Sequence, residues 1–172
     1  MTAAEALQRL KTGEGLVGVE VRGQLDLQAL EDTGGVRLPV LLRGCRLPAV
    51  DASDLVFHAP VTFERCHVDA ALFYAAYFLQ GARFEACTFG GDVTFECGGH
   101  NEAPAAFTLL NCTFQGFVNF FDNWYPGPVE VRGCRFEGGT NLLGNRGQPY
   151  EVAFDLPPQI EGNSGVLDAD GG

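Results

Sequence analysis

Residues 71–89 read ALFYAAYFLQGARFEACTF, and they place a small residue and a large apolar residue, two positions apart, at every fifth or sixth position. Side chains two apart on an extended chain point the same way, so both members of each pair are predicted to face a β-type core. An α-helix is excluded, because apolar residues spaced by five drift around a 3.6-residue turn. Seven consecutive pairs keep this step: Val61/Phe63, Cys66/Val68, Ala71/Phe73, Ala76/Phe78, Ala82/Phe84, Cys87/Phe89 and Val93/Phe95.

Four such pairs make one longer repeat. Weaker copies begin at Gly18 and Pro149, so repeats start near residues 18, 39, 60, 81, 105, 128 and 149. A fixed period in the twenties is typical of stacked coils, in which each unit buries its face against its neighbours. The sequence therefore predicts an all-β solenoid of about seven coils with 21–25 residues each. Five cysteines mark the period, separated by 21, 21, 25 and 22 residues: Cys45, Cys66, Cys87, Cys112 and Cys134.

The pattern from Ala71 to Phe89 resembles the pentapeptide-repeat family in its Phe-rich form, clearly over residues 39–136 and irregularly over 18–156. The resemblance implies a right-handed quadrilateral parallel β-helix with columns of large and small side chains inside. It also implies a binding role, because some members of that family look like duplex DNA in size and charge and bind DNA gyrase and other type II topoisomerases.

The two ends differ from the repeats. Thr2-Ala-Ala-Glu5 is a capping-box pattern followed by Leu7 and Leu10, which predicts a short N-terminal helix over the first coil. We therefore divide the chain into a capping segment (1–17), a β-helix repeat domain (18–160) and an acidic, Gly-rich C-terminal tail (161–172). The tail is expected to be mobile after Asp168.

The five cysteines are interpreted as small buried side chains that form a structural column. No CxxC pair occurs, and single thiols one strand spacing apart offer no tetrahedral metal site. Disulfides between them are disfavoured because parallel side chains about 4.8 Å apart exceed the geometry of the bond. Cys97 lies outside the column. We expect neither a metal nor another cofactor.

The net charge of −11 argues against direct binding to nucleic acid, which is driven by clustered cations. No signal peptide or membrane-spanning run is recognised, so a cytoplasmic protein with no membrane contact is expected. Strips between the Cys-containing segments hold eleven acidic residues against two Arg, which predicts one acidic side of the rod. That side is either a solubilising surface or a DNA-like one; its representative residues are Asp51, Asp54, Asp69, Asp92 and Glu96.

Two longer coils are predicted to carry loops at 97–105 and 121–128 that protrude side by side. Loops on a rigid scaffold often bind partners, and these contain aromatic residues beyond those the columns need. The alternative is that Trp124 and Tyr125 fold back and fill the widened coil. The candidate partner-binding residues are His100, Glu102, Phe121, Asp122, Asn123, Trp124 and Tyr125.

The sequence favours a non-enzymatic binding or scaffold protein that acts through protein–protein contacts. A β-helix carbohydrate-active enzyme is the alternative, but it needs carboxylates that converge in a groove, and most carboxylates here lie at dispersed positions. A catalytic set of His100, Glu102 and Asp122 lacks an accompanying nucleophile motif. The sequence leaves open a homodimer formed through a coil end or through the aromatic loop.

Overall fold

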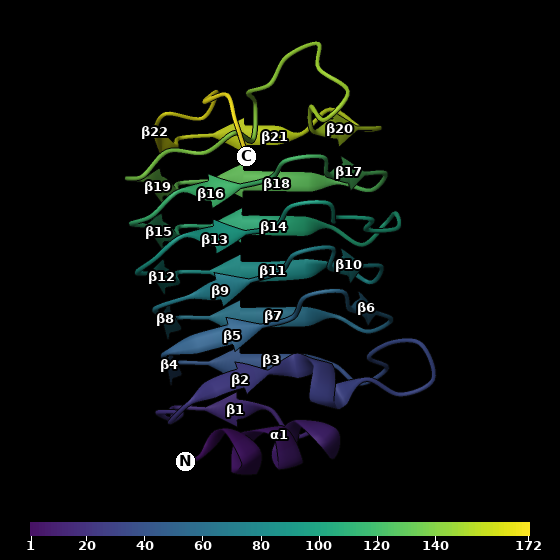
Figure 1. Ribbon diagram of the computed structural model, residues 1–172, viewed down its shortest axis with the longest axis vertical. Coiled ribbons are helices and arrows are strands. Elements are labelled where there is room, and N and C mark those ends of the chain that lie inside the picture. The colour runs from purple at the N-terminus through teal and green to yellow at the C-terminus, as the bar shows by residue number, and fades with distance from the viewer.

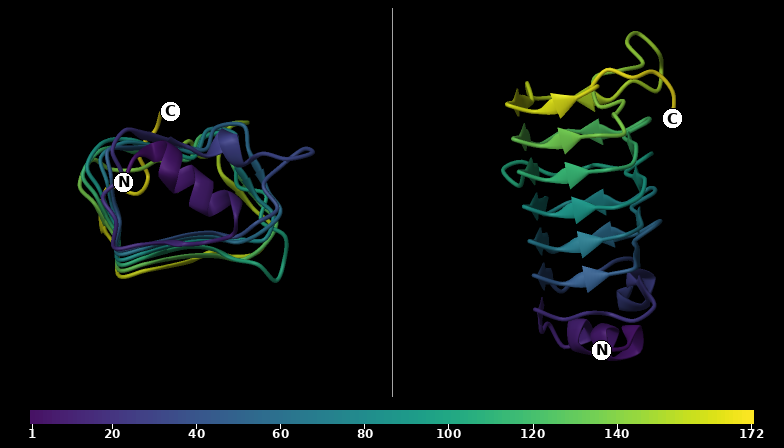
Figure 2. Two further views of the ribbon diagram at one scale, coloured as in Figure 1. Left: turned by 90° about the horizontal axis from the view of Figure 1, so that it is seen from below. Right: turned by 90° about the vertical axis from the view of Figure 1, so that its left-hand side faces the viewer.

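The computed structural model describes all residues, 1–172, and shows a parallel β-solenoid of about six turns with one short N-terminal helix. Every strand pair is parallel, and each coil bonds to the coils before and after it (Figure 1). Viewed along its axis, the rod has four sides (Figure 2). The predicted β-solenoid class is confirmed, with about six turns where about seven coils were expected.

Each side of the rod is a stack of short strands, named here by its place in the coil. The first face contains β1 (Leu16–Val17), β3 (Val40–Arg43), β7 (Val61–Glu64), β11 (Ala82–Glu85), β14 (Phe107–Leu110), β18 (Val129–Arg132) and β21 (Gln159–Glu161). The second face contains β4 (Arg46–Leu47), β8 (His67–Val68), β12 (Thr88–Phe89), β15 (Thr113–Phe114), β19 (Arg135–Phe136) and β22 (Ser164–Gly165).

The third and fourth faces are shorter stacks. The third contains β2 (Gln24–Asp26), β5 (Ala49–Asp51), β9 (Ala71–Leu72), β13 (Val93–Thr94) and β16 (Val118–Asn119). The fourth is split into two pairs, β6 (Val56–Phe57) with β10 (Tyr77–Phe78), and β17 (Trp124–Tyr125) with β20 (Ala153–Phe154). Gly99 bridges the two pairs through single contacts to Tyr77 and Trp124.

The core consists of the paired inward residues that the sequence predicts. All fourteen members of the seven pairs are buried, and rings of successive coils stack on one another, as Phe89, Phe114 and Phe136 do at centroid distances of 5.0 and 5.1 Å. Stacking turns the large column into a continuous apolar ladder. This packing compensates for strands only two to four residues long.

The turns between faces use left-handed backbone at equivalent positions. Between the first and second faces this position has φ between 51° and 62°, and before the fourth face it has φ between 49° and 58°. Most of these residues are not glycine, so each turn costs backbone strain that the stacked coils offset. The first series is Gly18, Gly44, Arg65, Ala86, Asn111, Gly133 and Gly162 (φ +64°), and the second is Asp54, Ala75, Cys97 and Asp122.

The first coil begins earlier than the repeat starting at Gly18 predicts. The capping helix α1 (Ala3–Lys11) is present, with its capping box formed by Thr2 and Glu5, but Leu16–Val17 already pairs with Leu42–Arg43. The first coil therefore spans 26 residues, from Leu16 to Leu42. Its extra residues form a 3-10 helix, η1 (Leu27–Leu30), and a turn before Val36.

The last coil also differs from the prediction. The copy at Pro149 was placed on the first face, yet Ala153–Phe154 pairs with Trp124–Tyr125 on the fourth, and Gln159–Glu161 takes the first-face position. In place of a separate tail, residues 161–172 complete the final coil. Asn163 stands in the register of the cysteines, where its Oδ1 accepts from Cys134 N at 2.8 Å and its Nδ2 donates to Val131 O at 2.8 Å.

Candidate functional site

The candidate partner-binding residues lie on or beside the fourth face, and they do not form two protruding loops. Residues 97–105 are an insertion, but Trp124–Tyr125 is the regular strand β17 (Figure 1). The expected pair of adjacent loops is therefore wrong for 121–128. A two-residue strand exposes alternate side chains, so Trp124 faces outward and Tyr125 inward.

Tyr125 and Asn123 belong to the core. Tyr125 is fully buried, and burial raises the pKa of its phenol. The Asn123 Nδ2 donates to the Tyr125 hydroxyl at 3.0 Å, while its Oδ1 accepts from Gly98 N at 2.6 Å. For these two residues the coil-filling alternative is correct, and neither is available to a partner.

His100 takes an unusual place in the fold. It stands at the register of Phe78 and Tyr125, whose rings point inward, but its φ of 57° turns the imidazole outward. The ring stacks on Tyr77 at a centroid distance of 3.8 Å and meets Trp124 edge-to-face at 5.1 Å. Burial between these rings lowers the pKa of His100, so the imidazole is neutral at pH 7.

Trp124 is the most exposed member of this group, with 42% of its surface accessible. Its indole Nε1 donates to Asp155 Oδ1 at 2.9 Å, which holds the ring in one orientation. Tyr74, three residues before Tyr77, is also 42% exposed. We call Tyr74, Tyr77, His100 and Trp124 the aromatic surface.

The other candidate residues border the aromatic surface. Phe121 stacks on Tyr150 at 4.5 Å, and both side chains are half-buried. Glu102 and Asp122 are exposed. No hydrogen bond or ion pair joins His100, Glu102 and Asp122, so these three residues do not form an acid–base set.

The representative acidic residues lie on or next to the third face, and four of them have local partners. Asp51 accepts from Gln24 at 3.2 Å, and Glu96 from Asn119 at 3.3 Å. Asp92 accepts from the backbone of Phe117 at 2.8 Å, while His67 lies 2.9 Å from Asp69. These carboxylates therefore help to hold successive coils together. Asp54 is an exposed corner residue.

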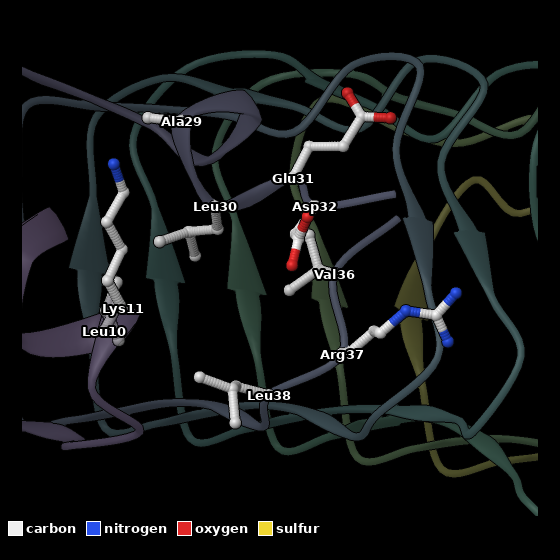
Figure 3. Close-up of a pocket in the computed structure, with 9 residues that line it drawn as sticks. All are labelled: Leu10, Lys11, Ala29, Leu30, Glu31, Asp32, Val36, Arg37 and Leu38. Carbon is white, nitrogen blue, oxygen red and sulfur yellow. The ribbon is translucent and has the colours of Figure 1, made fainter. Parts of the chain in front are cut away.

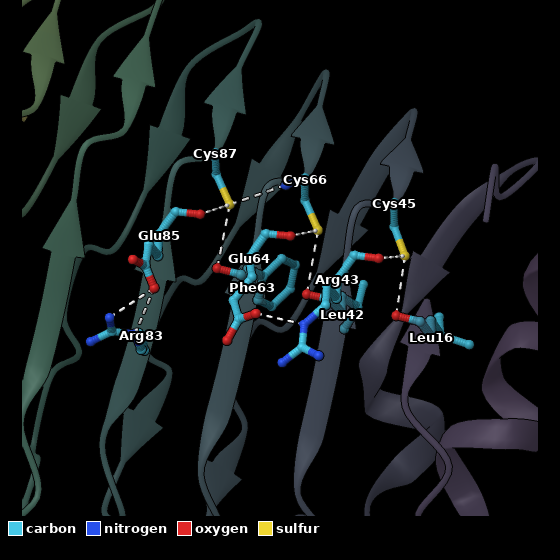
Figure 4. Close-up of polar contacts among 10 residues, drawn as sticks. All are labelled: Leu16, Leu42, Arg43, Cys45, Phe63, Glu64, Cys66, Arg83, Glu85 and Cys87. Carbon is cyan, nitrogen blue, oxygen red and sulfur yellow. Dashed lines mark hydrogen bonds and ion pairs between the residues drawn. The ribbon is translucent and has the colours of Figure 1, made fainter. Parts of the chain in front are cut away.

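On the first face, by contrast, arginines pair with carboxylates. Arg43 lies 2.6 Å from Glu64, and Arg83 lies 2.7 Å from Glu85, while Arg132 pairs with Glu130 (Figure 4). Such exposed pairs neutralise charge locally and contribute little stability, about 0–1 kcal/mol each.

The cysteine column is buried, and each thiol donates to a carbonyl of the preceding coil (Figure 4). For Cys87 this acceptor is Phe63 O at 3.4 Å, and for Cys66 it is Leu42 O at 3.5 Å. The neighbouring Cys66 thiol and burial together raise the pKa of Cys45. The column is thus a set of protonated structural thiols, and no group of three or more His, Cys, Asp or Glu side chains could hold a metal ion.

Sequence reasoning missed three contributors. Tyr77 was assigned only to a turn of the repeat, and Asp155 was not connected to Trp124. Phe107 stands in the small-residue column, at the register of Ala82 and Val129. That substitution was a readable signal: a large ring in a small position indicates a missing large residue nearby, which is the outward-turned His100.

Comparison with known proteins gives no match: no family model, no curated protein and no solved structure is similar to this chain. None of its helices has the length and apolar character needed to cross a membrane. Function is therefore inferred from the geometry alone.

Proposed function

We propose that the protein is a non-enzymatic binding or scaffold protein that contacts a protein partner through the aromatic surface. The observation that carries this proposal is the exposed Trp124 ring, held by Asp155 and His100 on a rigid β-solenoid. Exposed aromatic side chains dominate the energetics of many protein interfaces. Fixing the ring before binding reduces the conformational entropy lost on association.

We also propose that the chain is a pentapeptide-repeat protein. In support, small and large inward residues recur at five- or six-residue steps through the coils between Val40 and Phe136, on four faces. The six free cysteines suit a reducing compartment, which supports a cytoplasmic location.

Binding to a type II topoisomerase through the acidic side is the second candidate. It is supported by the net charge of −11 and by the rod-like shape in Figure 2. The local partners of Asp51, Asp69, Asp92 and Glu96 weaken it, because these carboxylates are already engaged within the rod. A supercoiling assay with DNA gyrase tests it: no inhibition at high molar excess of the protein removes this candidate.

The main proposal is tested by quantitative affinity capture with the wild type, Trp124→Ala and Val166→Ala. Val166 is a matched control, because it is 57% exposed and apolar but lies in the last coil, outside the aromatic surface. Proteins that bind through the aromatic surface should be retained by the wild type and by Val166→Ala, and lost with Trp124→Ala. Capture of the same set by all three refutes the proposal.

A second copy of the chain is also a partner that this surface could hold. Light scattering after size exclusion measures the mass of the wild type and Trp124→Ala. A dimer that becomes a monomer only in the Trp124 variant identifies the partner as a second copy.

A further inference from the structure

A pocket of about 340 Å³ opens at the N-terminal end of the rod, away from the aromatic surface. It lies between the C-terminal turn of α1, η1 and the turn that follows η1 (Figure 3). Its volume falls in the range of small-molecule sites. The nine lining residues are Leu10, Lys11, Ala29, Leu30, Glu31, Asp32, Val36, Arg37 and Leu38.

The pocket has a structural cause. Val36 pairs with Phe57 of the next coil, so the first coil has a valine where the next two coils have phenylalanine on the fourth face. The smaller side chain leaves space beside α1. The first coil thus ends in an apolar hollow formed by Leu30, Val36 and Leu38.

The wall that carries the acidic residues is well fixed. Asp32 N donates to Gly35 O at 3.0 Å, which closes a tight turn. Val36 N then donates to Val56 O at 2.8 Å, and His58 N donates to Val36 O at 2.9 Å. A Cβ on Gly35 would collide with Val56 O, so the turn is seated directly against the next coil. The pocket is therefore preformed by backbone contacts.

The charges around the hollow are separated. In Figure 3, Lys11 stands on one side and Asp32 and Glu31 on the other, with the apolar side chains between them. None of these three residues makes an ion pair. Arg37 points away from the apolar side chains and donates to Thr33 O at 3.3 Å within its own turn.

We propose that this pocket binds a small zwitterion with apolar side chains, of the size of a free dipeptide. Its carboxylate faces Lys11, its ammonium group faces Asp32 and Glu31, and its side chains cover Leu30, Val36 and Leu38. The charge complementarity selects this class: a purely apolar ligand leaves three charged groups without partners, and a simple anion or cation satisfies only one wall.

Methyl and amide NMR titration tests the proposal with four probes: Leu-Leu, its N-acetylated form, its C-amidated form and the doubly capped form. Leu-Leu should shift the signals of Leu30, Val36 and Leu38 saturably, and double capping should weaken binding about five-fold, as expected for two exposed ion pairs. Each single cap should cost about two-fold.

Two variants assign the groups. Lys11→Gln should weaken only the probes with a free carboxylate, and Asp32→Asn only those with a free ammonium group. Arg9→Gln and Glu14→Gln are matched controls, because they remove a charge near α1 outside the pocket and should leave all four affinities unchanged. The proposal is overturned if all four probes bind equally, if the pocket signals do not shift saturably, or if the two variants show no dependence on the caps.

Discussion

Replacing Phe107 by alanine should destabilise the protein more than any other truncation in the small-residue column. His100 turns out of the core, and Phe107 fills the space this leaves between two coils. Its ring lies 5.9 Å from that of Phe78 and 5.1 Å from that of Tyr125, the two large fourth-face side chains on either side of the gap. Three more rings surround it, those of Phe84, Phe95 and Phe120.

The expected cost follows from this packing. Truncating a buried phenylalanine to alanine costs about 3–5 kcal/mol, and the high end applies where the cavity cannot collapse. Phe107 is fully buried, and the stacked coils above and below hold its neighbours in place. Val129→Ala in the same column removes two buried carbon atoms and should cost about 1.5–2.5 kcal/mol. Phe107→Leu preserves more volume and should fall between the two.

Urea unfolding followed by circular dichroism measures these differences. At a slope of about 2 kcal/mol per M, Phe107→Ala should lower the midpoint by about 2 M, roughly twice the change in Val129→Ala. The slopes must agree among the variants for the comparison to hold. If Phe107→Ala costs no more than Val129→Ala, Phe107 does not compensate for His100, and the explanation is wrong.

Three further predictions concern single groups. The folded state lowers the pKa of His100 below its ordinary 6.5, so its contribution to stability is present above that pH and lost as the pH falls through it; emission from Trp124, the single tryptophan, should change with a midpoint below 6.5, and not in His100→Gln. A thiol reagent should modify at most Cys97 in the native protein and all six cysteines in denaturant, whereas native labelling of several thiols would contradict the buried column. Thr2→Ala should reduce the free energy of unfolding by about 0.5–2 kcal/mol through loss of the capping box, measured by thermal denaturation, and Thr2→Ser should retain most of it.

The sequence predicts the central coils well because the same physical constraint recurs there. Between Val40 and Phe136, most inward positions hold a small or a large apolar residue at a fixed spacing, and parallel stacking requires each to match the one below. The N-terminal helix was also predictable, since Thr2 and Glu5 satisfy each other's backbone groups locally. Neither inference needs information about distant contacts.

The terminal coils were misplaced because the small-x-large motif is the same on every face. Val152 and Phe154 fit a first-face strand as well as a fourth-face strand, so the motif cannot say which side of the coil it occupies. Long-range contacts decide it, as when Ala153 N donates to Asn123 O. The outward turn of His100 was likewise hidden, because it depends on how the insertion at 97–105 closes.

The extra residues of the three long coils fall mainly on the same side of the rod. Asp26 and Leu42 are 16 residues apart, whereas the equivalent Asp51 and Phe63 are 12 apart. Thr94 and Phe107 are 13 apart, against 10 for Leu72 and Ala82, and Thr140 and Ala153 are 13 apart, against 6 for Val118 and Trp124.

A physical reason for this asymmetry lies in the strands. First-face strands of up to four residues pair in register with both neighbours, so an insertion there would shift several inward side chains at once. The fourth face has strands of two residues and a break at Gly99, so it accepts added residues at lower cost. The aromatic surface and the N-terminal pocket both arise where such residues enter. The regular faces therefore maintain the rod, and the irregular side is where binding sites can differ from one coil to the next.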